Sequence, residues 1–158
     1  MSYDDSQGRV AAVFRPDSEV DGLVRPKTAM RFTAPGSVTE GRYGLFRYDM
    51  QPRAGGPQPH FHRTFSEAFY VLSGTVSLFD GDGWADGHAG DYLHVPEGGI
   101  HAFSNRSDEP ASMLILFAPG MAREEYFRGL AEIADSGREL SPEEMTAFLA
   151  SHDQYMVE

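Results

Sequence analysis

Two observations predict that the sequence forms an all-β domain followed by a C-terminal pair of α-helices. From about residue 30 to residue 117, short apolar runs are cut by Gly, Pro, Asp and Asn, which is typical of a sandwich or barrel of short strands. After Pro119 the apolar residues change to a helical period. The chain has 158 residues, 41% of them hydrophobic, which suffices for one domain with a real core.

The strands are predicted from apolar runs that end at turn residues. Val10–Phe14 is expected to form a short strand that ends at Pro16, and residues 17–27 are expected to form a loop. Gly74 separates two of the later runs, and Asp80-Gly81-Asp82-Gly83 is a strong hairpin signal. The strands expected after the loop are 29–33, 43–50, 68–73, 75–79, 83–86, 91–95, 101–105 and 111–117.

Two amphipathic helices are predicted after residue 119. The apolar face of the first consists of Phe127, Leu130, Ala131 and Ala134, and Gly137 is a plausible stop. The second begins at Ser141, which serves as the N-cap, with Pro142 at the first helical position and Glu144 completing a capping box. Amphipathic faces usually pack, so the helices are expected to cover the β-domain rather than to act as a lid or bind a partner.

Charge and composition exclude several classes of protein. The net charge is −11, with 13 Lys and Arg against 24 Asp and Glu, so a general nucleic-acid binder is not expected. The absence of cysteine excludes disulfides, thiolate metal sites and a cysteine nucleophile. The first eight residues are polar and no later stretch is apolar enough to span a bilayer, which predicts a cytoplasmic protein without a membrane partner.

Three histidines and one glutamate have the spacing of a single metal site: His60, His62, Glu67 and His101. Alternate residues of a strand share a face, so His60 and His62 are expected to point the same way. If Glu67 faces inward, Phe69 does too. Three imidazoles and one carboxylate suit a divalent transition metal (Fe, Mn, Ni, Co, Cu or Zn) and leave positions open for a substrate.

The same residues resemble the two signature motifs of the cupin superfamily. His-x-His-x4-Glu-x6-Gly is met from His60 to Gly74, and Gly-x5-Pro-x-Gly-x2-His-x3-Asn from Gly90 to Asn105. The one departure is Ala54, where the family has a leading glycine; Gly55 and Gly56 follow it directly. The pattern is similar to small single-domain cupins described as quercetin-dioxygenase-like.

This resemblance implies a cupin double-stranded β-helix (jelly-roll) barrel that binds metal through His60, His62, Glu67 and His101. It also implies three segments within a single domain. These are an N-terminal extension with short strands (1–39), the cupin core barrel (40–118) and a C-terminal helical segment (119–158).

Residues that share a strand face with the predicted metal ligands are candidates for the pocket wall. Phe69 and Phe103 share faces with Glu67 and His101, and Tyr48, Met50 and Gln58 are the next candidates. Arg47 and Arg53 are candidates to bind a substrate carboxylate, although an exposed salt bridge is the simpler interpretation for each. Asn105 is interpreted as a turn or strand-end anchor.

The charge of such a site narrows the chemistry. A divalent ion with one carboxylate keeps a net positive charge, which favours an enolate, phenolate or carboxylate ligand. The leading hypothesis is a metal-dependent dioxygenase or related oxidoreductase acting on a small aromatic or enolisable (flavonol- or diketone-like) substrate, with Glu67 as a catalytic proton carrier. A redox-neutral isomerase or polyketide-cyclase-like enzyme and a non-catalytic small-molecule binding cupin remain open. Unpaired edge strands also predict a homodimer.

Overall fold

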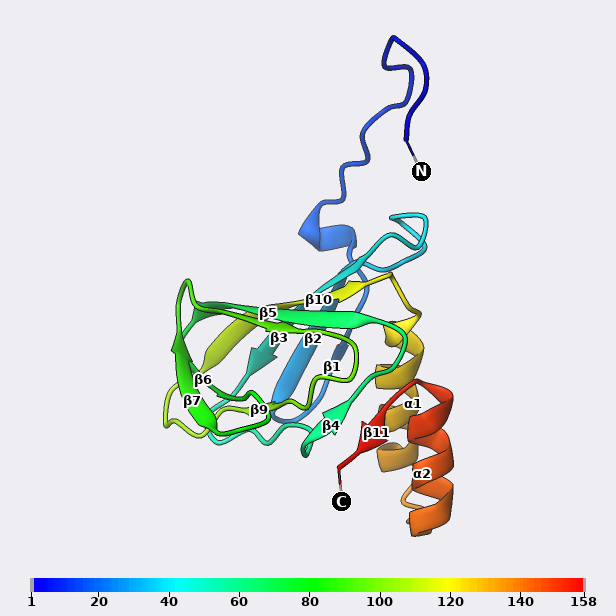
Figure 1. The fold of residues 1–158 in the computed structure, drawn as a ribbon. Helices are drawn as coiled ribbons and strands as arrows, with labels where there is room; N and C mark the ends of the chain where they lie inside the picture. The colour runs from blue at the N-terminus through cyan, green and yellow to red at the C-terminus, as the bar shows by residue number, and fades with distance from the viewer. Residues whose placement is uncertain (1, 158) are drawn as a thin grey trace.

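The computed structural model describes residues 2–157 as two facing β-sheets with two helices packed at one side (Figure 1). The six-stranded sheet has the order β1-β2-β3-β10-β5-β8, and the three-stranded sheet has the order β7-β6-β9. The strands of the first sheet are β1 (Gly22–Val24), β2 (Thr28–Ala34), β3 (Gly44–Met50), β10 (Ala111–Ala118), β5 (Ser66–Ser73) and β8 (Tyr92–Val95). The strands of the second are β7 (Trp84–His88), β6 (Thr75–Phe79) and β9 (Ala102–Ser104).

The chain passes from the larger sheet to the smaller one at Gly74, between β5 and β6. Gly74 has φ +70, and a Cβ there would lie 2.2 Å from the carbonyl oxygen of Pro110. Only glycine combines this backbone conformation with so close an approach. The predicted jelly-roll barrel is therefore confirmed, and the motif glycine marks one of its corners.

Aromatic and branched side chains fill the space between the sheets. Strand β10 shows the period-2 pattern: Met113, Ile115 and Phe117 are buried while the residues between them are half-buried. Phe46 from β3 lies edge-on to Phe117, with ring centroids 5.4 Å apart. Helix α1 (Arg123–Asp135) reaches this core through Phe127, whose ring centroid is 6.1 Å from that of Phe46.

The C-terminal segment returns to the barrel. Helix α2 (Pro142–Ser151) begins with the predicted capping box between Ser141 and Glu144. It is followed by the short strand β11 (Tyr155–Met156), which pairs with β4 (His60–Phe61). Figure 1 shows this red strand beside β4, at the end of the barrel covered by the helices. The segment thus contacts the first pair of histidines as well as covering the barrel.

Two expectations for the N-terminal region are wrong. Residues 10–14 form no strand in the described chain: Val10, Val13 and Phe14 are 80%, 73% and 88% exposed, and the segment extends away from the sheets (Figure 1). A strand needs a hydrogen-bonded neighbour, and among residues 2–157 this segment pairs with no strand. The expected loop 17–27 instead contains a 3₁₀ turn, η1 (Asp17–Glu19), and strand β1.

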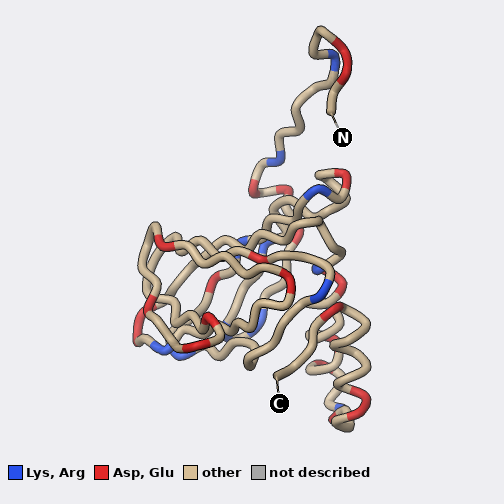
Figure 2. Tube along the Cα trace, viewed as in Figure 1, with Lys and Arg blue, Asp and Glu red and all other residues tan. Residues whose placement is uncertain are grey.

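Charged residues are spread along the surface. In Figure 2, acidic residues recur on the loops and at the starts of α1 and α2, with Lys and Arg interspersed among them. None of the described helices has the length and apolar content needed to cross a membrane.

Candidate metal centre

The four predicted ligand residues meet in the interior of the barrel. His60, His62, Glu67 and His101 are 3%, 2%, 6% and 0% exposed, and one ligand atom of each lies within 4.8 Å of the others. His60 belongs to β4, Glu67 to β5, and a single antiparallel bridge joins His60 to His101 just before β9. Two motifs separated in sequence are therefore placed side by side by backbone pairing.

Backbone carbonyls orient all three imidazoles. The Nδ1 atoms of His60, His62 and His101 lie 2.8, 2.7 and 3.0 Å from the carbonyl oxygens of Gln58, Asp153 and Gly99. A carbonyl only accepts hydrogen bonds, so each Nδ1 carries the proton and donates it. In the neutral ring this leaves the Nε2 lone pair unprotonated, which is the tautomer that binds a metal.

The donor set fits a metal ion. Oε2 of Glu67 lies 3.1 Å from Nε2 of His62 and 2.8 Å from Nε2 of His101. Lone pairs of neutral rings facing a carboxylate at this distance repel, so a cation is required between them, either protons on the rings or a metal ion. Ligand atoms bound at about 2.0–2.2 Å to one ion lie up to about 4.4 Å apart, so small side-chain shifts close the set around it.

The protonation states of the metal-free cluster leave one neutral imidazole and one ionised carboxylate. Burial, and then the charge on His101, lower the pKa of His60 to about 3, so this ring stays neutral. Burial opposes ionisation of Glu67, but hydrogen bonds from His101 and His62 outweigh it and hold the pKa of Glu67 below its ordinary value. Burial likewise lowers the pKa of His101, but the bond to Glu67 outweighs this and raises it. The centre therefore presents an ionised carboxylate.

A cavity of about 430 Å³ opens beside this cluster and is lined by His60 and Glu67. Of the residues predicted for the pocket wall, Tyr48, Gln58 and Phe103 line it. Phe69 is fully buried, with its ring centroid 5.8 Å from that of His101, and Met50 is buried in the core; neither lines the cavity. The size and mostly apolar wall are those of a small-molecule site.

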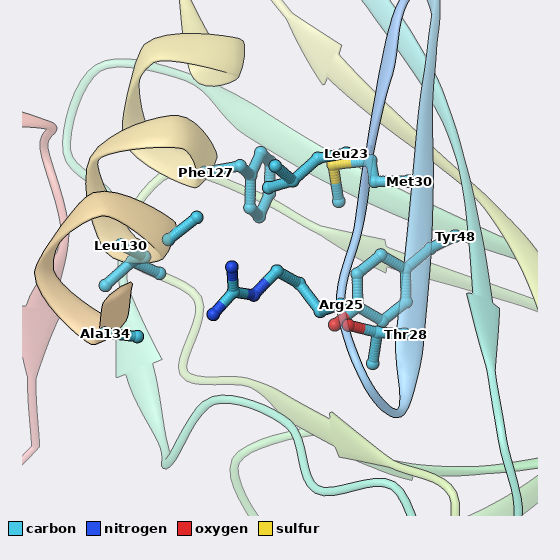
Figure 3. A pocket seen from close by; sticks show the side chains of 9 residues that line it. Leu23, Arg25, Thr28, Met30, Tyr48, Phe127, Leu130 and Ala134 are labelled. Carbon is cyan, nitrogen blue, oxygen red and sulfur yellow. The ribbon is translucent and has the colours of Figure 1, made fainter. Parts of the chain in front are cut away.

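A smaller pocket of about 160 Å³ continues the cavity between the β1–β2 hairpin and α1 (Figure 3). The residues that line both are Thr28, Tyr48, Phe127 and Leu130. Figure 3 shows Arg25 reaching from the hairpin toward the helix, where its guanidinium donates two 2.8 Å hydrogen bonds to the carboxylate of Asp135. This exposed pair links the hairpin to α1.

The other polar candidates lie outside the cavity. Arg47 pairs with Asp49 at 3.1 Å and Arg53 with Asp108 at 2.8 Å, both as exposed ion pairs. The buried Asn105 anchors a turn: its amide donates to the carbonyl oxygens of Gln51 and Glu109, and its oxygen accepts from Ser107. Arg47 and Arg53 therefore form the exposed salt bridges that were the simpler interpretation of each, and Asn105 has the predicted role of a turn anchor.

Comparison with known proteins identifies the barrel. The cupin domain family model, Cupin_2, matches residues 46–117. The chain carries a cupin domain. A quercetin 2,3-dioxygenase from Bacillus subtilis is 28% identical over 120 residues, which are 72% of this chain and 33% of that protein. The chain thus spans about a third of the length of this relative.

Solved structures share the cupin fold. A polyketide cyclase from Streptomyces resistomycificus has a TM-score of 0.58 and 22% identity, covering 68% of this chain and 80% of its own. A predicted oxalate decarboxylase from Thermotoga maritima has a TM-score of 0.61 and 16% identity, covering 68% and 99%. At these identities the likeness concerns the fold.

The C-terminal segment supplies contacts to this cupin centre that sequence reasoning missed. Asp153, in a left-handed conformation at φ 55, accepts the Nδ1 proton of His62 through its backbone carbonyl. Its carboxylate accepts hydrogen bonds from the backbone N–H of Arg63 and of Thr64 and from the Thr64 hydroxyl. An acid after a helix end carries no sequence signal for this role, because the contact joins residues about 90 positions apart.

We expect Asp153→Ala to weaken both the fold and the metal centre. Losing the carboxylate removes bonds to the turn that follows His62, and alanine tolerates the left-handed conformation poorly. The free energy of unfolding should fall by about 2 kcal/mol, and metal affinity by about tenfold or more. Chemical denaturation and chelator competition measure these. Asp153→Asn is the matched control, because it keeps an acceptor and the left-handed tolerance; equal losses in both variants would contradict the assignment.

Proposed function

We propose that the chain is a metal-dependent dioxygenase or related oxidoreductase that acts on a small aromatic or enolisable (flavonol- or diketone-like) substrate. The observation that carries this proposal is the cavity of about 430 Å³ in which two members of the buried cluster, His60 and Glu67, form part of an otherwise mostly apolar wall. The similarity to a quercetin 2,3-dioxygenase supports the reaction class.

In this proposal, His60, His62, Glu67 and His101 hold a divalent transition metal through three Nε2 atoms and a carboxylate oxygen. The metal would supply a positive centre that stabilises the anionic form of the substrate and, if redox active, electron transfer with O2. Glu67 receives or returns a substrate proton at its carboxylate. The apolar residues of the cavity position the ring or enol system and exclude bulk water.

Oxygen consumption tests the proposal. Protein loaded separately with Fe(II), Mn(II), Ni(II), Co(II) or Cu(II) is offered a panel of flavonols, catechols and β-diketones in an oxygen electrode, with anaerobic incubations as the control. We expect O2 uptake with at least one class, and its loss in Glu67→Ala. Turnover that persists anaerobically or with Zn(II) would indicate a redox-neutral isomerase or cyclase. A ligand recovered unchanged, with no uptake across the panel, would indicate a binding module.

We also propose a homodimer in which the N-terminal segment packs on a second copy. Val10, Val13 and Phe14 are strongly exposed apolar residues on one short segment, and β1, β7 and β8 are sheet edges. Light scattering should give twice the 17.4 kDa chain mass, and Val13→Asp with Phe14→Asp should shift it toward one chain. A parent protein that is monomeric at high concentration would contradict this.

A further inference from the structure

The first residue of helix α1, Arg123, is a buried cation beside the candidate metal centre. Its side chain is 4% exposed and lines the 430 Å³ cavity together with His60 and Glu67. Among residues 2–157, Arg123 contributes the one cationic side chain in that wall and Glu67 the one carboxylate. A guanidinium stays charged in a protein, so its burial needs a compensating partner.

The partners that the described chain provides are neutral. Nη1 donates to the carbonyl oxygen of His152 at 2.8 Å, and Nη2 donates to Oε1 of Gln154 at 3.2 Å. The guanidinium also lies 4.1 Å from the ring centroid of Tyr126, a favourable cation–π contact. Nη1 and Nη2 each carry a second hydrogen beyond these bonds, so the guanidinium keeps N–H donors for a ligand in the cavity. Its Nε is fully buried and has no hydrogen-bond acceptor within residues 2–157.

The nearby carboxylates are already engaged. Oε2 of Glu67 faces Nε2 of His62 and of His101 within the candidate metal cluster, and the carboxylate of Asp153 accepts from the backbone of residues 63 and 64. No carboxylate among residues 2–157 lies within ion-pair distance of Arg123, whereas Arg47 and Arg53 each have one. A purely structural role in holding residues 152–154 would need only neutral donors, and would leave the buried charge without an ion-pair partner.

We propose that Arg123 binds an anionic oxygen group, a carboxylate or an enolate, of the small molecule that occupies this cavity. The substrate is then anchored at two points, at the metal and at Arg123, and carries its anionic oxygen as the enolate of a diketone or flavonol or as the carboxylate of an aromatic or keto acid. The metal-side anchor rests on the function proposed above. A divalent ion together with Arg123 outweighs the single negative charge of Glu67, so the cavity wall attracts an anion. The planar guanidinium is suited to carboxylate recognition, and the low dielectric of the cavity strengthens the pair.

A matched pair of probes, benzoate and benzamide, tests this in the full chain loaded with Zn(II). The two have similar shape and differ in charge. Calorimetry should show benzoate binding about tenfold or more tightly than benzamide. Arg123→Gln should remove this preference and Arg123→Lys should keep part of it, with zinc content unchanged. Arg128→Gln, which removes an exposed arginine of the same helix paired with Asp21, is the control and should retain the full preference.

Arg123 also holds the C-terminal segment, so a second measurement uses the unmutated protein. In ¹⁵N-labelled, zinc-loaded chain, the guanidinium N–H resonance that shows cross-peaks to the Tyr126 ring should move on addition of benzoate and not of benzamide. Benzoate that fails to bind, or that binds without moving this resonance, would overturn the proposal, as would a preference retained in Arg123→Gln. Neither measurement involves O2, so a negative oxygen-uptake result would affect the proposed reaction and leave this assignment standing.

Discussion

Replacing His101 with alanine should lower the affinity of the chain for divalent transition metals by more than about 100-fold, because loss of a ligand exceeds the 10–100-fold effect of losing an outer contact. His101 is fully buried, it lies 2.8 Å from Glu67, and its Nδ1 is fixed by the carbonyl oxygen of Gly99. No other described residue is placed to substitute for it in the cluster. Competition against a chromophoric chelator measures the affinity of the folded variant.

The control is His94→Ala, which removes an exposed histidine of β8 and should leave metal affinity unchanged. Metal should also raise the free energy of unfolding of the parent protein, by about 4 kcal/mol when the free metal concentration is about a thousand times the dissociation constant. It should not stabilise His101→Ala. Equal metal affinity in parent and His101→Ala would show that the ion binds elsewhere.

Gly74→Ala should be among the most destabilising single substitutions in the chain, lowering the free energy of unfolding by about 3 kcal/mol or more. The added Cβ would meet the backbone oxygen of Pro110 at 2.2 Å, and φ +70 is unfavourable for alanine. Because the obstructing atom belongs to the backbone, one of the two strands has to move. Urea denaturation followed by circular dichroism measures the effect.

Two further glycines separate the causes of that effect. Gly90 has φ +94, and no atom lies within 4 Å of the place that an added Cβ would take, so Gly90→Ala should cost about 1 kcal/mol from conformation alone. Gly83 has neither a positive φ nor a close neighbour, so Gly83→Ala should change stability by less than about 0.5 kcal/mol. A Gly74→Ala variant as stable as Gly90→Ala would show that the corner has room for a side chain.

Local signals in the sequence predicted most of the barrel. The strands from residue 28 onward combine period-2 burial with turn residues, and the second helix begins with a complete capping box. Each of these patterns involves only a few neighbouring residues. The cluster of His60, His62, Glu67 and His101 was also predictable, because these residues sit at fixed offsets within two motifs. Structure that depends on a few neighbouring residues can therefore be predicted from the sequence.

The remainder depends on contacts between distant segments. Strand β11 has two residues, which are too few to show a hydrophobic period, and it forms because it pairs with β4. The sequence pattern therefore does not predict it. Conversely, the apolar run 10–14 has strand composition but pairs with no described strand. In the sequence, Arg123 looks like an ordinary charged residue in the first turn of a helix. It becomes buried because residues 152–154 fold back onto it. The exposed Arg47 and Arg53 were candidates for the role that we now propose for Arg123.

Metal analysis of the full chain, purified without chelators and without a nickel column, tests the central claim most directly. Mass spectrometry of the digested protein should find close to one transition-metal ion per chain, as expected for a single cluster of four ligands. The His101→Ala variant prepared in parallel should carry none. A parent protein that is isolated without metal, and that takes up none of Fe(II), Mn(II), Co(II), Ni(II), Cu(II) or Zn(II) when each is offered, would contradict a metal centre at this cluster.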